Sequence, residues 1–238
     1  MDFLQRTELL LGAEKLNTLK TSHILVVGLG GVGAYAAEMV ARAGVGELTI
    51  VDSDEVAVSN INRQLLALNS TIGQRKVDVM KTRLLDINPN IKINILDVYV
   101  NEKEVDGILD YAAYDCIIDA IDTVAPKVLL LEFALKRNYK IVSSMGSGGK
   151  MDPTLIEVAD IGSTHHCHLA HMLRKRLGSF GIRSGFLAVF SAESNRVGSM
   201  VECDELNKRS MVGTISYMPA VFGCVTASIA IKILLDEI

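Results

Sequence analysis

The sequence predicts a doubly wound α/β fold, with a mostly parallel, Rossmann-like sheet and helices on both of its faces. Three observations support this prediction. A strand-like run at 24–28 leads directly into a glycine-rich turn and a helical pattern. Short apolar runs then alternate with helical patterns as far as residue 144. One of these runs, 116–122, is mostly apolar, as expected of a parallel strand that is covered on both faces.

The elements of this core follow one another at short intervals. Gly44 and Gly46 stop the first helix of the motif, and Asn88-Pro89 ends an amphipathic helix further on. The expected order is helix 8–20, strand 24–28, helix 32–43, strand 47–52, helix 73–87, strand 91–98, helix 101–112, strand 116–122, helix 124–137 and strand 140–144.

The pattern changes after residue 145. A loop, SMGSGGK, is followed by an expected strand at 154–159, a helix at 165–178 with a basic end, a strand at 186–192 and a last helix at 217–235. We interpret residues 1–238 as one domain, with a nucleotide-binding core at 1–145 and a C-terminal elaboration at 146–238 for substrate and dimer contacts.

Composition restricts the class of protein. Hydrophobic residues make up 49% of the 238, so a large core can be buried. The net charge of −4 gives no general attraction for nucleic acid, and an RNA substrate would need a local basic patch. The four cysteines form no CxxC pair, which argues against a structural zinc site. No apolar run suited to a signal peptide opens the chain, so we expect a cytoplasmic protein.

The segment 217–235 is apolar and about long enough to span a bilayer. Lys232 interrupts it, and Pro219 and Gly223 lie near its start. Its small residues suit close packing against protein. We therefore interpret it as a buried or dimer-interface helix without stable membrane insertion, and membrane association is the alternative.

The glycine-rich turn is the strongest local signal. Gly28 lets the chain turn after the strand, Gly30 and Gly31 leave room for phosphate, and Gly33 allows the helix to pack closely. The N–H groups at the start of the helix favour negative charge. Asp52 ends the second strand, where its carboxylate can accept ribose hydroxyls. The motif leaves open whether the nucleotide is NAD or ATP.

Charged residues further along the chain favour ATP. Arg63 and Lys76 would neutralise a polyphosphate, and a carboxylate at Asp119 or Asp122 could hold Mg²⁺ near its α-phosphate. Arg63 and Lys76 could instead be solvated surface charges, and Asp119 could be structural. An NAD dehydrogenase needs no such cationic cluster.

The combination of GLGGVG, Asp52, SNINRQ, GQRK and DAIDT resembles the ATP-binding core of the ubiquitin-activating enzyme superfamily, which includes the MoeB and ThiF adenylyltransferases. Within it, residues 1–235 most resemble the tRNA threonylcarbamoyladenosine dehydratases. The sequences INRQLLALNSTIGQRK, SSMGSGGKMDPT, RKRL and FSAE carry this narrower match.

The resemblance implies roles for individual residues. It assigns nucleotide contact to Gly31 and its neighbours Gly28 and Gly30, ribose binding to Asp52, phosphate contacts to Asn60 and Arg63, the α-phosphate side to Lys76, and Mg²⁺ to Asp122. Arg6 matches an arginine that reaches into the neighbouring subunit's site in MoeB-like dimers, which implies a homodimer with composite sites.

The implied reaction is ATP-dependent dehydration of threonylcarbamoyladenosine at position 37 of tRNA through an acyl-adenylate, and a sulfur-transfer protein is a further partner to test. The alternative is a ThiF- or MoeB-like enzyme that adenylates a ubiquitin-like sulfur carrier. MoeB-like relatives often carry two CxxC pairs, and their absence favours the dehydratase. A non-catalytic nucleotide-binding scaffold and an NAD oxidoreductase fit the charged set less well.

Basic residues near the predicted helix 165–178 could contact tRNA phosphates. They are Arg174, Lys175, Arg176 and Arg183, with a second pair at Lys208 and Arg209. The alternative is a solvated helix end, where cations favour the helix dipole.

The run His165-His166-Cys167-His168 invites a metal hypothesis. Its spacing is too tight for all four side chains to ligate one ion. We interpret it as the start of a helix near the substrate, with a catalytic role for the Cys167 thiol as an open alternative.

Overall fold

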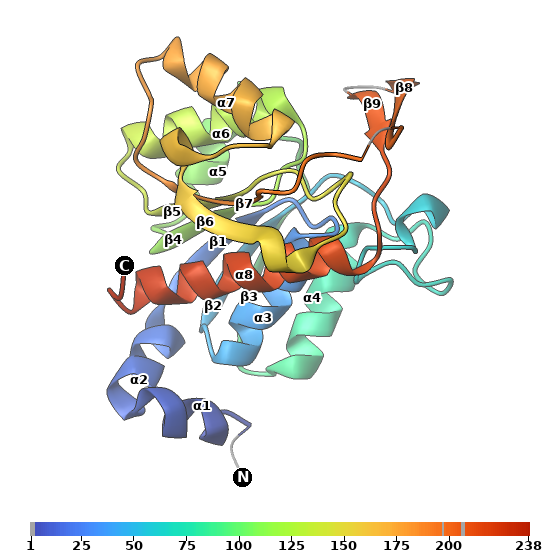
Figure 1. The fold of residues 1–238 in the computed structure, drawn as a ribbon. Helices are drawn as coiled ribbons and strands as arrows, with labels where there is room; N and C mark the ends of the chain where they lie inside the picture. Colours follow the sequence, from blue (N-terminus) through green and yellow to red (C-terminus); the bar gives the residue numbers. More distant parts are fainter. Residues whose placement is uncertain (1–2, 197, 206–207) are drawn as a thin grey trace.

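Seven strands form one sheet in the order β3-β2-β1-β4-β5-β7-β6, with helices on both of its faces (Figure 1). The computed structural model describes residues 3–196, 198–205 and 208–238. All neighbouring strands of the sheet are parallel except β6, which runs antiparallel to β7 at one edge. The predicted doubly wound α/β fold is confirmed.

The strands of the sheet are β1 His23–Val27, β2 Glu47–Val51, β3 Lys92–Leu96, β4 Cys116–Asp119, β5 Ile141–Ser144, β6 Ile156–Asp160 and β7 Leu187–Ser191. A separate hairpin consists of β8 Met200–Glu205 and β9 Lys208–Val212. The α-helices are α1 Gln5–Leu11, α2 Ala13–Thr21, α3 Gly33–Ala43, α4 Lys76–Ile87, α5 Val105–Leu109, α6 Val124–Lys136, α7 His168–Gly178 and α8 Tyr217–Leu234. Short 3-10 helices are η1 Val58–Asn60, η2 Pro153–Leu155 and η3 Ile161–Ser163.

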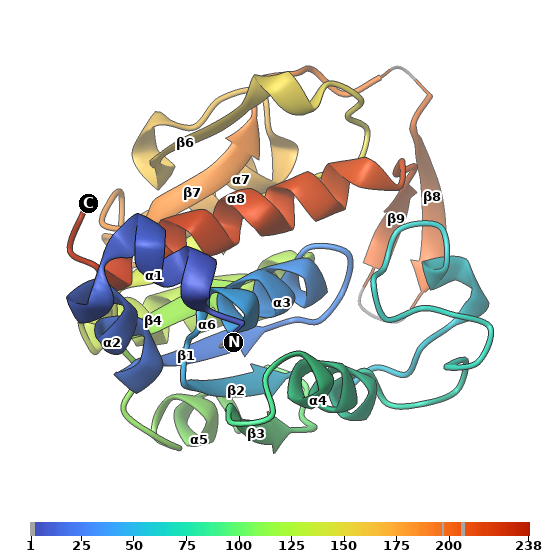
Figure 2. The ribbon, with the colours of Figure 1, turned by 90° about the horizontal axis from the view of Figure 1, so that it is seen from below.

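Alternate residues of β1 supply the two halves of the core. Ile24 and Val26 belong to an apolar cluster with α3, α4 and α8. Leu25 and Val27 belong to a second cluster with α5, α6 and α7. Because successive side chains of a strand point to opposite faces, a strand covered on both faces must be apolar throughout. Figures 1 and 2 show the two helical layers on either side of the sheet.

Four predicted helices differ from the observed ones. Two of them begin three residues later than predicted, α4 at Lys76 and α7 at His168. The other two differ more. The expected helix 8–20 is divided into α1 and α2 at Gly12, whose φ of +85° cannot continue a helix. The expected helix 101–112 is reduced to the five residues of α5. There the Asn101 side chain accepts the N–H groups of Lys103 and Glu104, which holds the preceding segment in a turn.

The apolar helix α8 lies along one face of the sheet beside α3 (Figure 2). Its length and composition would allow it to cross a membrane, yet 56% of it is buried inside the protein. A Cβ on Gly223 would lie 2.5 Å from the carbonyl oxygen of Val32, so glycine lets α8 approach the start of α3. The helix is therefore a core element, as its small residues predicted.

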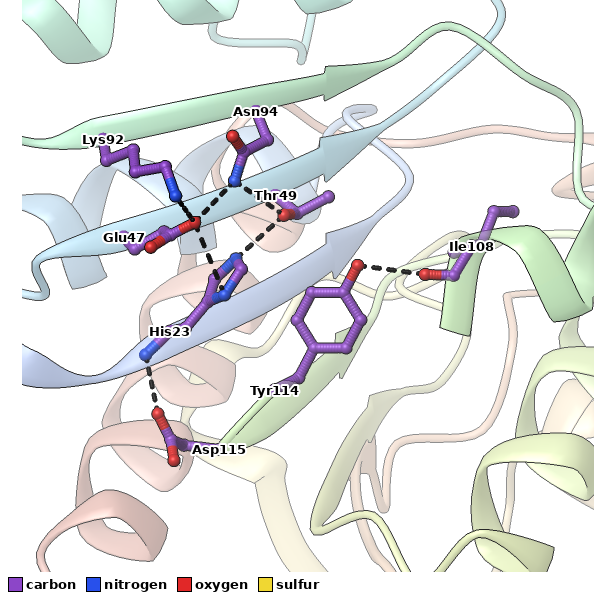
Figure 3. Close-up of polar contacts among 8 residues, drawn as sticks. All are labelled: His23, Glu47, Thr49, Lys92, Asn94, Ile108, Tyr114 and Asp115. Atoms are coloured by element: carbon purple, nitrogen blue, oxygen red, sulfur yellow. Dashed lines mark hydrogen bonds and ion pairs between the residues drawn. The ribbon is translucent and has the colours of Figure 1, made fainter. Parts of the chain in front are cut away.

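A buried polar network lies where β1, β2 and β3 begin, at the amino edge of the sheet (Figure 3). The His23 ring Nε2 lies 2.8 Å from Thr49 Oγ1, and its Nδ1 lies 3.6 Å from the Glu47 carboxylate. Glu47 also accepts from Asn94 and pairs with Lys92.

The environment of His23 disfavours its charged form. Burial lowers the pKa of the His23 imidazole, the charge of Lys92 lowers it further, and the carboxylates of Glu47 and Asp115 oppose this effect. The Tyr114 ring stands edge-on to the imidazole at 4.9 Å, and burial raises the pKa of this phenol to about 12. Burial thus outweighs the Glu47 carboxylate, and the uncharged Thr49 and Tyr114 also contact the ring.

We predict that the protein loses stability as the pH falls below 6.5, the ordinary pKa of histidine. Below that pH the unfolded chain protonates His23 while the folded chain, with its lowered pKa, does not. The unfolded state then binds more protons, so the free energy of unfolding falls by at most about 1.4 kcal/mol per pH unit. Urea unfolding at pH 7.5, 6.5 and 5.5 measures this slope, and His23→Gln should flatten it. Equal slopes for the variant and the parent would contradict the assignment.

Candidate nucleotide-binding site

The glycine-rich turn lies between β1 and α3, at the carboxyl edge of the sheet. Gly28 has a φ of +91°, and a Cβ there would lie 2.8 Å from the carbonyl oxygen of Ala120, which follows β4. Only glycine combines this backbone conformation with so close an approach. A Cβ on Gly31 would meet the Pro219 ring at 2.8 Å, so close packing against α8 also requires glycine there. The surroundings of Gly30 are open, with the nearest side-chain atom, Gln64 Nε2, 3.8 Å from its Cβ position.

Asp52 connects the end of β2 to this turn. Its carboxylate accepts the Leu29 N–H at 2.6 Å and the Asp54 N–H at 2.8 Å, and 9% of the side chain is exposed. Burial raises the pKa of the Asp52 carboxyl, and the nearby charge of Lys76 opposes this shift. The carboxylate is therefore fixed beside the glycine backbone, where sequence analysis placed a ribose-binding group.

Lys76 is the first residue of α4 and is almost fully buried, with 5% of its side chain exposed. Its Nζ lies 2.7 Å from Asp54 Oδ2 and 3.9 Å from Asp52 Oδ1. Since Asp52 also binds the turn at Leu29, the ammonium group lies near the glycine turn. The alternative that Lys76 is a solvated surface charge is wrong.

Arg63 and Asn60 lie on the segment that connects β2 to α4. The Arg63 guanidinium donates to the carbonyl oxygen of Ser59 at 2.9 Å and to the Asn62 side chain at 2.8 Å. Its backbone oxygen lies 3.5 Å from the Cβ position of Gly31, so this segment runs over the turn. Asn60 caps η1 by accepting the Ala57 N–H. The backbone of Arg63 thus lies at the turn, its head group is held within its own segment, and Asn60 lies three residues earlier in that segment.

The two aspartates after β4 differ in their surroundings. Asp119 is completely buried, pairs with Lys127 of α6 at 2.7 Å and accepts the Ser143 hydroxyl at 2.6 Å. It also accepts the N–H of Ile121, while Lys127 donates to the carbonyl oxygen of Ile121. Of the two interpretations of Asp119, magnesium ligand or structural residue, its burial and ion pair support the structural one. Asp122 is exposed on the segment that this ion pair holds in place.

Arg6 lies apart from these residues. It is exposed on α1, which packs against α2 ahead of the start of β1 (Figure 1), whereas the glycine turn follows the end of β1. Within one chain, Arg6 is therefore not part of the group of predicted residues around the glycine turn.

The predicted tRNA contacts occupy two places. Arg174, Lys175 and Arg176 lie on α7, and Arg183 follows it. Lys208 and Arg209 lie in β9, and their side chains are outside the described part of the chain.

The histidine-rich segment at 165–168 precedes α7. His165 Nδ1 lies 2.8 Å from His166 Nδ1, and the buried Cys167 caps the helix. Within the described residues, no group of three His, Cys, Asp or Glu side chains could hold a metal ion, so the metal hypothesis has no support there.

Three further residues at this edge of the sheet were given no role from the sequence alone. They are Asp54, which pairs with Lys76; Lys127, which pairs with Asp119; and Gln64, whose buried Oε1 has no hydrogen-bond partner within the described residues. Asp54 follows a predicted strand end, where polar groups were expected. Lys127 lies inside an otherwise apolar helical run, and a buried lysine needs a buried acid as its partner.

Known proteins resemble this chain in sequence and in fold. A model of the ThiF family matches residues 4–237. The tRNA threonylcarbamoyladenosine dehydratase of Bacillus subtilis is 46% identical over 189 residues, which cover 79% of this chain and 74% of that protein. The Escherichia coli protein of the same name is 37% identical over 246 residues, covering 95% of this chain and 91% of its own. Solved structures of the E. coli dehydratase in complex with ATP and with AMP each give a TM-score of 0.89 at 36% identity, covering 98% of this chain and 93% of theirs.

We predict that Lys127→Met lowers the free energy of unfolding by about 3–5 kcal/mol, because it leaves the Asp119 carboxylate buried without a counter-charge. The double variant Asp119→Leu/Lys127→Met should recover a large part of that loss, since no unpaired charge remains. Urea denaturation of the three proteins measures both effects. A single variant as stable as the parent would show that the pair is not buried as described.

Proposed function

The chain belongs to the ThiF family, and we propose that it acts as an ATP-dependent tRNA threonylcarbamoyladenosine dehydratase. One observation carries the proposal: the almost fully buried ammonium of Lys76 beside a glycine turn, in a chain that matches an ATP-bound dehydratase over 98% of its length. A buried cation next to a helix N-terminus suits a polyphosphate. The protein is accordingly an enzyme that activates a carboxylate with ATP.

The nucleotide would lie across the glycine turn. Backbone N–H groups at Gly30 and Gly31 would face the phosphates, since Gly30 has open surroundings. The free electron pairs of the Asp52 carboxylate would accept a ribose hydroxyl. Lys76 would leave Asp54, which is 68% exposed and easily solvated, and would bind the α-phosphate. Arg63 and Asn60 would reach the outer phosphates from the segment above.

The reaction then proceeds in two displacements. A carboxylate oxygen of the threonylcarbamoyl group attacks the α-phosphorus, and pyrophosphate leaves. An atom of the same group's urea next attacks the acyl carbon, closing a ring and expelling AMP, which carries away the oxygen lost by the nucleoside. Because the second nucleophile is intramolecular, its effective concentration is high. The enzyme therefore needs charge stabilisation at the α-phosphate more than a nucleophile of its own.

Asp122 fits a magnesium ion bound together with the nucleotide. It is an exposed carboxylate on a segment fixed by the Asp119–Lys127 pair. Magnesium in such sites takes one or two protein carboxylates and fills its shell with phosphate oxygens and water. The ion would neutralise charge that develops on the departing pyrophosphate.

A homodimer would complete the site. Helix α1 has no buried residue, and Leu9 and Leu10 are 82% and 84% exposed. Adjacent leucines this exposed on one short helix favour burial against a second chain. In such a dimer Arg6, beside these leucines, would enter the partner's nucleotide site. We place this enzyme in the cytoplasm, where its tRNA substrate is.

We predict that the protein, incubated with ATP, Mg²⁺ and tRNA carrying threonylcarbamoyladenosine, removes one water from that nucleoside. Mass spectrometry of the digested tRNA measures the loss. Lys76→Ala should lower the rate by on the order of 10²–10³, as expected for removing one preorganised charge from the transition state. Lys81→Ala is the matched control, because it removes an exposed lysine from the same helix.

Two results would contradict this function. A parental rate for Lys76→Ala would show that the buried ammonium group does not contribute to catalysis. A nucleoside of unchanged mass, combined with pyrophosphate exchange stimulated by a ubiquitin-like carrier, would assign the enzyme to the sulfur-carrier adenylyltransferases instead.

Arg6→Ala and Asp122→Ala should each be inactive alone and active when mixed. In a composite dimer, one of the two sites of each mixed pair has an intact Asp122 with an intact Arg6 from its neighbour. Random exchange of subunits then restores about a quarter of the parental activity. Activity assays before and after subunit exchange measure the recovery. If the mixture stays inactive while exchange is complete, Arg6 does not act across the dimer.

A further inference from the structure

A shallow cavity lies beside α7, on a different part of the molecule from the nucleotide site. It measures about 410 Å³ and is lined by Gly162, Arg174, Gly178 and Arg183. Helix α7 begins next to the segment after β5, where Leu169 Cβ lies 3.8 Å from the Cβ position of Gly146. The cavity involves its other end, because Gly178 is the last residue of α7 and Arg183 lies in the segment between α7 and β7.

The walls of the cavity are fixed by Asp160. Its two carboxylate oxygens accept the N–H groups of Gly162 and Gly185, each at 2.8 Å. A Cβ on Gly162 would lie 2.8 Å from the carbonyl oxygen of Arg183, so glycine allows the loop to approach η3. Arg174 donates to the Thr164 hydroxyl from the helix side. Two arginines from separate segments are thereby brought to one depression.

The surrounding charge is positive. We define the α7 basic patch as Arg174, Lys175, Arg176 and Arg183. Within the described residues, no carboxylate forms an ion pair with any member of this patch. Several arginines elsewhere are neutralised: Arg75 pairs with two aspartates, Arg83 with Glu38, and Arg137 with two aspartates. In a chain of net charge −4, the α7 basic patch is therefore a local site for a polyanion.

An exposed aromatic residue follows α7 in the sequence. Phe180 follows α7 and is 52% exposed, in the same loop as Arg183. An exposed aromatic ring among arginines is the combination that holds RNA, with the phosphates on the guanidinium groups and an unstacked base on the ring.

We propose that this cavity and the α7 basic patch bind the tRNA backbone, with a phosphodiester between Arg174 and Arg183 and a base against Phe180. The proposal rests on the proposed function, since it supplies the anchor for that substrate. Helix α7 is about 16 Å long. Its first turn packs against Gly146 after β5, and the cavity is lined by Arg174 and Gly178 further along it. A substrate that reaches both the nucleotide edge and this cavity must therefore be longer than a free nucleoside, as an anticodon arm is.

The test compares a long and a short substrate. Arg183→Gln and Phe180→Ala are assayed singly and together, with tRNA carrying threonylcarbamoyladenosine and with a trinucleotide carrying the same modification. We expect the double variant to raise KM for the tRNA about ten-fold with kcat unchanged, and to leave KM for the trinucleotide and for ATP unchanged. The slope of log Kd for tRNA against log salt, measured by fluorescence anisotropy, should fall by about one for Arg183→Gln. Lys81→Gln makes the same charge change on α4 and is the control.

The outcomes separate this proposal from the proposed function. Parental tRNA affinity and salt dependence in the double variant would overturn the site, even if the enzyme dehydrates tRNA normally. An equal loss with the trinucleotide would overturn it too, because the residues would then act through the nucleotide edge. If the parent binds tRNA but dehydrates neither substrate, the proposed function fails, and the anisotropy measurement still decides whether the α7 basic patch holds RNA.

Discussion

The ammonium group of Lys76 is buried at the start of a helix, and the nucleotide edge of the sheet is organised around it. Both the helix dipole and the loss of water oppose a cation in that place. Asp54 at 2.7 Å and Asp52 at 3.9 Å offset that cost. Asp52 also binds the Leu29 N–H, so the acid that faces the lysine fixes the glycine turn as well. A triphosphate in this place would carry more negative charge than Asp54. Lys76 would therefore favour the phosphate over Asp54 as its partner.

A second buried charge pair lies directly before Asp122, the acid proposed to bind magnesium. Asp119 and Lys127 connect β4 to α6 beneath the sheet edge, and both contact the backbone of Ile121. Burying such a pair contributes little net stability, because desolvation consumes most of the attraction. The pair instead fixes the backbone of Ile121, and Asp122, one residue further on, is exposed outside any helix or strand. The proposed tRNA contacts lie apart from it, on α7 and the loop that follows.

The elements that could be predicted from the sequence are those with a regular apolar pattern. Features that depend on one backbone angle or one tertiary contact were missed. Every strand of the sheet was predicted, and the central strands β1 and β4 were clearest because burial on both faces requires apolar residues throughout. The edge strands β3 and β6 are only partly buried. The β8–β9 hairpin lies in a polar stretch without that signal. The helix at 8–20 was wrong because Gly12 adopts a positive φ that a lone glycine does not announce. At the site, Lys76 and Asp52 were found from their motifs, whereas the partnership of Asp119 with Lys127 depends on how α6 packs.

A crystal structure with ATP and Mg²⁺ would test the central claim directly. The expected result is that Lys76 Nζ leaves Asp54 and lies about 2.7–3.2 Å from an α-phosphate oxygen, with the phosphates across Gly30 and Gly31. Lys76 still bound to Asp54, with the triphosphate elsewhere on the protein, would contradict the account of this edge as the site of carboxylate activation.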